Sequence, residues 1–321
     1  STGWAVDGAG DVNGDGLADI VIGAPTGEAV WVVFGRTTTT NVTLGAPGFG
    51  GFRIGTPGPG VSSVGYAVAG LGDVNGDGIP DIGIGAPTGG VGPGTLFVIF
   101  GARPSSDVSL QSLGTGGWAL NGAPGPNGDF DFGRSVDGAG DVNGDGKADI
   151  VVGASVSNAV FTAGGRAFVV FGGVSTPSPD VSGIGARGFA ILPEAANDLL
   201  GTSVAGLGDV NGDGRPDVAV GAQQAKVGST APGKVYVVYG KATSTSVDTS
   251  ALLASGSTII GAADGDAIGS ALAGVGDVNG DGVSDLAVGG FLANPAGRMQ
   301  AGSVYVVYGG GLPSSVQLGS L

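Results

Sequence analysis

The chain alternates short apolar runs with polar, glycine-rich turns, and the same succession of runs recurs five times. In the fourth succession, TSVAG ends at Gly206, the acidic string DVNGDGRPD starts at Asp209, VAVGA starts at Val218, VYVVYG starts at Val235 and, after a variable loop, STII starts at Ser257. Runs rich in Val, Ile, Phe and Tyr between Gly, Pro, Asn and Asp predict β-strands, and no window keeps the period of an amphipathic helix. The pattern therefore predicts an all-β fold with four short strands in each repeat.

The acidic string DVNGDG sets the length of the repeat. It begins at Asp11, Asp73, Asp141, Asp209 and Asp277, so successive copies lie 62 or 68 residues apart. Four antiparallel strands with glycine-rich turns in a unit of this length are typical of one blade of a β-propeller. We therefore predict a single β-propeller domain over residues 1–321, with blades at about 1–60, 61–126, 127–195, 196–263 and 264–321.

Two strands of each repeat have a distinct composition. The first consists of small residues, as in AVDG and SVAG, which suits the crowded axis of a propeller, and it places Asp7 and Asp137 at equivalent positions near that axis. The third, such as VYVVYG from Val235, is apolar almost throughout, so both of its faces should pack between neighbouring blades. These third strands are the predicted core.

The last repeat is shorter than the others. A fourth strand is predicted after each of the first four repeats, starting at Gly51, Gly117, Gly188 and Ser257, whereas the fifth repeat reaches Leu321 before any such strand. The sequence thus predicts nineteen strands and a last blade that lacks its outer strand. Because an open strand edge invites pairing with another chain, we also expect self-association through this incomplete blade.

Composition removes several kinds of chemistry. The 321 residues include no His and no Cys, which excludes imidazole bases, thiolate nucleophiles, disulfides and His-containing zinc sites. A net charge of −15 with only 12 scattered Lys and Arg residues argues against binding to nucleic acid or to an anionic membrane surface. No apolar run approaches the roughly 20 residues of a membrane-spanning helix, so no membrane insertion is expected. The chain begins at Ser1 without a signal peptide, as expected of a mature protein or an excised part of one.

The nine-residue acidic loop DVNGDGxxD has the composition of a metal site. Side-chain oxygens stand at positions 1, 3, 5 and 9, a backbone carbonyl stands at position 7, and Gly at position 6 permits a sharp turn, as in the first part of an EF-hand loop. Position 12, where an EF-hand has a Glu ligand, is Ile or Val, so the loop is predicted to join strands one and two as a β-hairpin. The predicted ligands are Asp11, Asn13, Asp15, the Leu17 carbonyl and Asp19; Asp73, Asn75, Asp77, the Ile79 carbonyl and Asp81; Asp141, Asn143, Asp145, the Lys147 carbonyl and Asp149; Asp209, Asn211, Asp213, the Arg215 carbonyl and Asp217; and Asp277, Asn279, Asp281, the Val283 carbonyl and Asp285.

The same loops account for the charge of the chain. With three Asp in each of five loops, they contain 15 of the 27 acidic residues, and the other 12 balance the 12 basic ones. Oxygen donors at flexible spacing favour Ca²⁺ over Mg²⁺ or Zn²⁺, so the sequence predicts about five Ca²⁺ ions, one per blade. Without a cation the carboxylates repel one another, which should leave the loops strained or disordered. The alternative is a set of Asn/Asp/Gly turns that bind no metal.

Several strings resemble a known family. FGRSV from Phe132, DVNGDGKADIVVGA from Asp141, GAP at Gly23 and Gly85, and the VYVVYG strand resemble FG-GAP repeats, which occur in the seven-bladed propeller of integrin α subunits and in many bacterial surface and secreted proteins. The FG pair is altered in the other repeats, and GAP is altered in repeats three to five, but the predicted metal ligands are unaffected. The resemblance implies a propeller with Ca²⁺ in the hairpins of one rim and an extracellular, secreted or cell-surface role in adhesion or ligand recognition.

We therefore expect a non-enzymatic module that binds a protein or glycan ligand through its variable loops, with Ca²⁺ as a structural ion. The alternative is the propeller portion of a secreted enzyme such as a polysaccharide lyase or phospholipase. That alternative requires a non-repeating cluster of Lys, Tyr, Arg and Asp, and the sequence shows none.

Other candidate residues favour structural roles. The carboxylate pairs Asp129/Asp131 and Asp264/Asp266 could serve glycoside hydrolysis, but they stand in the loop that enters strand one, where turn-making is favoured. Two further groups are the three tryptophans and the scattered arginines Arg36, Arg53, Arg103, Arg134, Arg166 and Arg187. Core packing is expected of Trp4, Trp31 and Trp118, and a solvated surface is expected of arginines such as Arg134.

Overall fold

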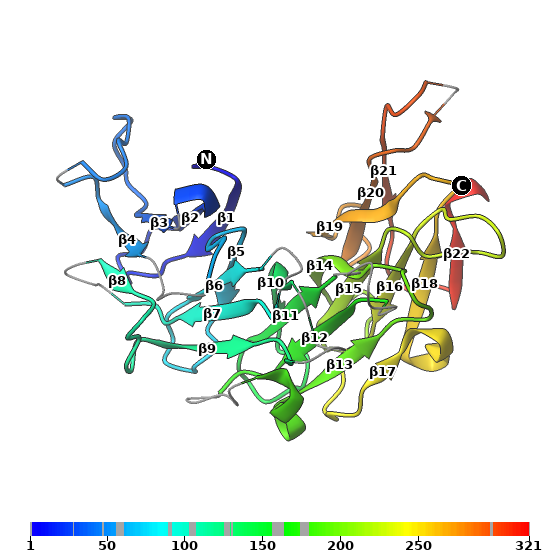
Figure 1. Cartoon of the computed structure of the whole chain (residues 1–321), viewed down its shortest axis with the longest axis horizontal. Coiled ribbons are helices and arrows are strands. Elements are labelled where there is room, and N and C mark those ends of the chain that lie inside the picture. Colours follow the sequence, from blue (N-terminus) through cyan, green and yellow to red (C-terminus); the bar gives the residue numbers. More distant parts are fainter. Residues whose placement is uncertain are drawn as a thin grey trace.

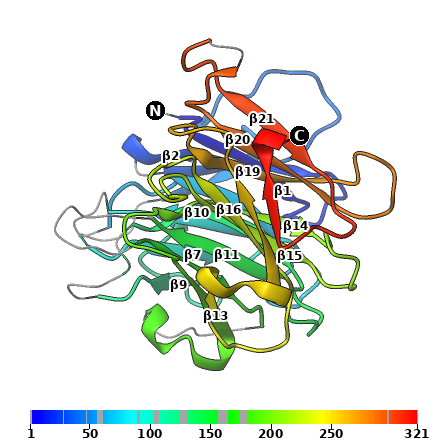
Figure 2. The ribbon, with the colours of Figure 1, turned by 90° about the vertical axis from the view of Figure 1, so that its right-hand side faces the viewer.

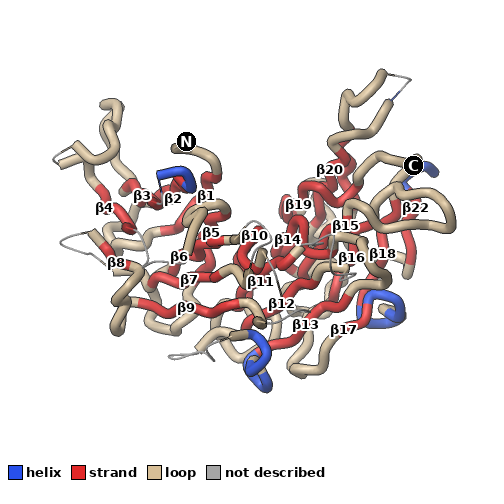
Figure 3. Tube along the Cα trace, viewed as in Figure 1, coloured by secondary structure: helices blue, strands red, loops and turns tan. Residues whose placement is uncertain are grey.

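The computed structural model describes residues 2–27, 29–46, 48–55, 61–88, 92–102, 107–124, 129, 131–155, 164–173, 180–295 and 298–320. Within them the fold is all-β, with one sheet for each repeat (Figure 1). Short 3₁₀ turns are the helical elements (Figure 3). They are η1 (Pro25–Gly27), η2 (Val181–Gly183), η3 (Gly185–Arg187), η4 (Thr249–Ala251), η5 (Leu253–Ser255) and η7 (Leu318–Ser320).

The five sheets follow the chain in order. The first contains β1 (Ala5–Gly10), β2 (Asp19–Ala24), β3 (Ala29–Val33), β4 (Gly51–Gly55) and β8 (Val108–Ser109). The second contains β5 (Ala67–Gly72), β6 (Asp81–Ala86), β7 (Thr95–Ile99) and β9 (Gly117–Asn121). The third contains β10 (Phe132–Gly140), β11 (Asp149–Ala154), β12 (Arg166–Val170), β13 (Gly188–Leu192) and β17 (Val247–Asp248). The fourth contains β14 (Leu200–Gly208), β15 (Asp217–Ala222), β16 (Lys234–Val238), β18 (Gly256–Ile260) and β22 (Ser315–Gln317). The fifth contains β19 (Ile268–Gly276), β20 (Asp285–Gly290) and β21 (Ser303–Val307).

The four antiparallel strands expected in each repeat are confirmed in the first four sheets, and the fifth sheet has three strands in the described residues. The total of nineteen strands is wrong, because β8, β17 and β22 each add a short parallel strand to the sheet of the preceding repeat. Ile54 thus pairs with Val108, and Ile259 pairs with Val316. Strands of two or three residues are too short to carry an alternating apolar signal.

The first strands line the inner side of an arc, and the first and fifth sheets stand at its two ends (Figure 1). Consecutive first strands touch along the arc, in the order β1, β5, β10, β14 and β19. Seen from one end, the β19–β20–β21 sheet and the C-terminal strand face the viewer (Figure 2). The expected crowding of the small-residue strands is confirmed where neighbouring first strands meet, since a Cβ added to Gly70 would lie 2.1 Å from the Gly8 carbonyl oxygen, and one on Gly206 would lie 2.0 Å from that of Gly138.

The core fills the spaces between neighbouring sheets. The third strands β7 and β16 are buried along their whole length, and Tyr236 is among the largest fully buried side chains. The prediction that third strands form the core is thus confirmed for the middle sheets. In the fifth sheet, alternate residues of β21 are exposed.

Two further expectations concern the limits of the repeats and the membrane. The predicted repeat boundaries near residues 60 and 126 fall outside the described residues. No helix in the described part of the chain has the length and apolarity needed to cross a membrane.

Candidate metal centre

Each acidic loop joins the first strand of its sheet to the second, so the predicted β-hairpin is confirmed. The first strand ends in a bulge at a glycine, such as Gly10, whose φ of 73° lies in the left-handed region. The ninth loop residue opens the second strand. Because all five loops follow the same strand of their repeat, they lie at the same end of the sheets.

The first loop winds around the carboxylate of Asp11. Its Oδ1 accepts a hydrogen bond from the Asp15 N–H at 2.9 Å, and its Oδ2 accepts one from the Gly16 N–H at 2.7 Å. The Asn13 side chain donates to Asp15 Oδ2 at 3.0 Å. The sharp turn requires a φ of 90° at Gly16, which explains the glycine at the sixth position. The structure thus brings positions 1, 3 and 5 together, and the other four loops repeat this arrangement.

The ninth residue connects the loop to the third strand. Asp19 is buried, and it accepts hydrogen bonds from the Val12 N–H at 3.0 Å and from the Gly35 N–H at 2.8 Å. Equivalent bonds link Asp149 to Gly172 and Asp217 to Gly240 at 2.8 Å each. The glycine after each third strand was not singled out from the sequence. Its signal was the invariant final G of VVFG, VIFG and VYVVYG.

Burial raises the pKa of four of these ninth-position carboxylates and so makes them harder to ionise. Loss of solvent raises the pKa of Asp149 to about 7 and the pKa values of Asp81 and Asp217 to about 6 each, although backbone N–H donors lower them. The neighbouring loop carboxylates, such as Asp145 beside Asp149, raise these pKa values further. A cation held beside a buried carboxylate would have the opposite effect and favour the ionised form.

The donor set fits a hard cation, because every candidate ligand is a carboxylate, amide or carbonyl oxygen. The arrangement is not a finished site. Among the residues that the structure describes, no group of three or more Asp, Glu, His or Cys side chains converges closely enough to hold a metal ion. The carboxylate oxygens instead share backbone N–H groups, so holding a cation requires them to turn toward a common point.

The carboxylate pairs outside these loops have structural partners. Asp129 is buried and accepts a hydrogen bond from Arg166 at 3.1 Å, and Asp131 lies 4.0 Å from Arg134. Asp264 and Asp266 accept from backbone N–H groups at 2.7 Å and 2.8 Å.

Two carboxylates of the inner strands bridge neighbouring sheets. Asp7 accepts from the Gly70 N–H at 2.9 Å, and Asp137 accepts from the Gly206 N–H at 3.0 Å. Their expected place on equivalent inner strands is thus confirmed, and each connects its own sheet to the next.

The tryptophans divide into three environments. Core packing is confirmed for Trp118, which is 5% exposed. Trp31 is half-buried, with its ring 5.7 Å from that of Phe49 in an edge-to-face arrangement. The expectation is wrong for Trp4, which is 57% exposed.

Comparison of the sequence with known proteins finds the same repeats. The FG-GAP repeat model matches residues 2–33, 132–170 and 200–238. Integrin alpha pat-2 of Caenorhabditis briggsae is 31% identical over 264 residues, which are 78% of this chain and 20% of that protein. Integrin alpha-PS2 of Drosophila melanogaster is 32% identical over 177 residues, 47% of this chain and 11% of that protein. Integrin alpha-2 of Mus musculus is 33% identical over 148 residues, 45% of this chain and 12% of that protein.

The FG-GAP matches fall on the first, third and fourth of the repeats that the sheets and loops define. The chain belongs to the FG-GAP repeat family and is integrin-α-like. It spans a fifth or less of the length of these curated relatives.

Proposed function

We propose that this chain is a non-enzymatic, extracellular module for adhesion or ligand recognition, secreted or held at a cell surface. Its five sheets act as blades of a β-propeller, the last of which lacks its outer strand, and Ca²⁺ in the hairpin loops of one rim stabilises the fold. Membership of the FG-GAP, integrin-α-like family supports recognition of a protein or glycan ligand. The observation that carries the calcium part is the acidic loop, repeated five times with the same donors and the same internal hydrogen bonds.

Calcium would act on the loop charges. Each loop concentrates three carboxylates, one of them nearly or fully buried, and these are the groups whose mutual repulsion a divalent cation cancels. Loaded loops would fix the ends of the first, second and third strands together, because the ninth residue already contacts all three. The chain would then reach its full stability only outside the cell, where calcium is at millimolar levels.

Calorimetric titration of Ca²⁺ into chelator-treated protein tests this part of the proposal. We expect about five bound ions, as the five loops require, and a clear rise in the melting temperature. The double variant Asp209→Asn/Asp213→Asn should lose one ion, whereas Asp264→Asn, in a loop outside the acidic strings, should lose none. Absence of binding, or a melting temperature that ignores calcium, would reduce the loops to plain turns.

The open face of the fifth sheet supports self-association. Val304 and Val306 of β21 and Phe291 are exposed at this end of the molecule. Light scattering across a concentration series should show assembly that Val306→Lys weakens. A monomer at all concentrations would contradict this part of the proposal and leave the recognition role untouched.

A further inference from the structure

One position in each repeat changes its chemistry while its surroundings stay the same. It stands seven residues before each acidic string and is occupied by Trp4, Tyr66, Arg134, Thr202 and Ser270. A glycine precedes it every time, with φ between 81° and 86°, and Ala or Ser follows. The backbone conformation is thus repeated five times, but the side chains are two aromatic rings, one guanidinium and two hydroxyls.

The structure brings these side chains together where the first strands begin, at the end opposite the acidic loops. The rings of Trp4 and Tyr66 are 5.4 Å apart between centroids, and the Arg134 guanidinium lies 5.4 Å from the centroid of Tyr66. Tyr66, Arg134, Thr202 and Ser270 line one cavity of about 460 Å³. Arg134, expected on a solvated surface, is half-buried here.

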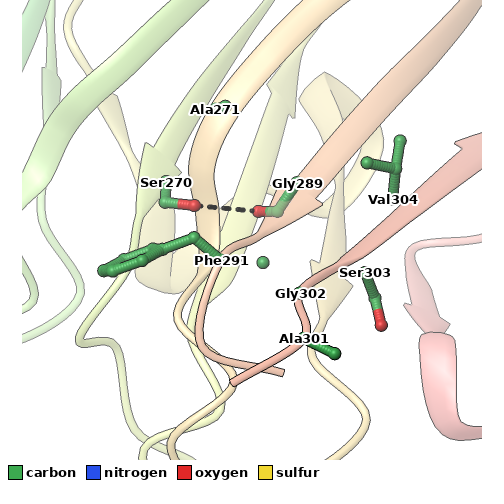
Figure 4. Close-up of a pocket in the computed structure, with 9 residues that line it drawn as sticks. Ser270, Ala271, Gly289, Phe291, Ala301, Gly302, Ser303 and Val304 are labelled. Carbon is green, nitrogen blue, oxygen red and sulfur yellow. Dashed lines mark hydrogen bonds between the residues drawn. The ribbon is translucent and has the colours of Figure 1, made fainter. Parts of the chain in front are cut away.

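Two residues from the turns after second strands complete this cavity. Gln223 adds an amide, and Phe291 adds an exposed ring. Phe291 projects past Ser270, whose hydroxyl donates to the Gly289 carbonyl at 3.2 Å (Figure 4). An adjoining cavity of about 340 Å³ shares Ser270 and Phe291 and is lined otherwise by small and apolar residues such as Gly302 and Val304. We call the residues Trp4, Tyr66, Arg134, Thr202, Gln223, Ser270 and Phe291 the mouth cluster.

We propose that the mouth cluster binds a carbohydrate that carries a carboxylate, such as a uronic acid residue of a glycan. This inference rests on the recognition role proposed above and names its ligand class. Aromatic faces pack against the apolar face of a sugar ring, hydroxyl and amide groups match its hydroxyls, and a guanidinium forms paired hydrogen bonds with a carboxylate.

The charges around the cavity restrict the class of ligand further. Arg134 is the one cation among the described residues that line the cavity, and Asp131 lies 4.0 Å from it. Asp7 and Asp137 stand three residues further along the inner strands, in a chain of net charge −15. A highly charged polyanion would be repelled, whereas a glycan with one carboxylate at Arg134 and neutral sugar rings along the aromatic side chains fits. A peptide that adds a strand needs an open edge, and the inner edges of the first strands lie against one another, as the close approach of Gly70 to Gly8 and of Gly206 to Gly138 shows.

Calorimetric titration with two trisaccharides tests the proposal: one with a single galacturonic acid residue and its neutral galactose counterpart. The acidic sugar should bind more tightly, and Arg134→Gln should weaken it by about tenfold or more, the weight of one charge-assisted contact, while leaving the neutral sugar unchanged. Tyr66→Ala should weaken both. Arg187→Gln, an arginine at the outer part of the third sheet, is the matched control and should change neither.

Several outcomes would overturn the inference. They are equal binding of the two sugars, binding that Arg134→Gln leaves unchanged, and an acidic peptide that binds at Arg134 where the sugars do not. Each variant is first shown to melt like the original chain, with Tyr66→Phe as the conservative substitution that keeps the ring. Running the titrations with calcium and with chelator separates the two proposals, because loss of calcium binding contradicts the loop assignment and leaves the sugar result to stand alone.

Discussion

The sequence VYVVYG occurs twice, from Val235 and from Val304, and the two copies lie in different surroundings. In β16 the first copy is buried throughout, with Val235 and Val237 at 0% exposure. In β21 the second copy has Val304 at 75% and Val306 at 46% exposure. The difference comes from the neighbours, because β16 lies between the third and fifth sheets, whereas in the described part of the chain one face of β21 has no sheet against it.

The comparison shows that a third strand has two faces with separate roles. Tyr236 and Val238 pack toward the third sheet, and Val235 and Val237 pack toward the fifth. In β21, Val307 keeps the contact with the preceding sheet and is buried. The same six letters therefore encode a two-sided core strand in one place and a one-sided end strand in the other.

The largest expected effect comes from placing a charge on the same face of each copy, the face that is buried in β16 and exposed in β21. Val237→Asp should lower the free energy of unfolding by at least about 3 kcal/mol, because it buries an unpaired carboxylate. Val306→Asp should stay within about 0.5 kcal/mol of the original chain, because its side chain reaches solvent. Urea unfolding of both at low protein concentration measures the contrast, and equal losses would show that both faces are covered in solution.

A smaller effect is expected from Asp137, a half-buried acid on the first strand of the third sheet. Burial, together with the nearby Asp7 carboxylate, raises the pKa of Asp137 from 3.8 to about 6. The folded state therefore binds the proton of Asp137 more tightly than the unfolded state does. The contribution of this proton to the free energy of unfolding is fully present below about pH 4 and is lost as the pH rises through about 6.

Asp137→Asn removes that pH dependence. Between pH 4 and pH 7 the variant should gain on the order of 2 kcal/mol relative to the original chain. Unfolding measured in chelator at both pH values keeps the acidic loops free of metal in the comparison. A difference between the two chains that stays constant with pH would contradict the assignment.

The smallest expected effect returns to the two copies of VYVVYG. The Tyr236 hydroxyl donates to Glu194 Oε2 at 2.8 Å, and Lys234 donates to the same oxygen at 2.6 Å. Tyr236→Phe should lower the free energy of unfolding by about 1.5 kcal/mol, the lower end of the range for loss of one hydrogen bond to a charged acceptor, because Lys234 still bonds to Glu194. Tyr305→Phe is the matched substitution in the end strand and should cost less. Thermal melting of both variants distinguishes a hydrogen-bond effect from a packing effect.

Local signals were sufficient for most of the fold. The glycine and asparagine of DVNGDG predicted five hairpins, and the small residues at Gly70 and Gly206 predicted close contact between inner strands. The burial of β16 and the exposure of β21 were not separable from the sequence, because their residues are the same and only the presence of a neighbouring sheet differs.

The candidate site was predicted in part. The loop residues stood at fixed offsets, so their grouping was readable, whereas the contact between Asp19 and Gly35 depends on how the third strand returns to the loop. The mouth cluster was missed because Trp4, Tyr66 and Arg134 are separated by whole repeats and come together only through the arc of the sheets. Its signal was a variable position between a glycine found in all five repeats and a following Ala or Ser.

The parallel strands β8, β17 and β22 each complete the sheet of the repeat before their own. The repeat of the sequence and the sheet that folds are therefore out of phase. A fragment cut at residue 195 would keep β13 but lose Val247–Asp248, the strand that closes its edge. A repeat that is excised or transplanted should therefore include the short parallel strand from the repeat that follows it. A fragment trimmed to the sequence repeat would carry an exposed strand edge that the intact chain covers.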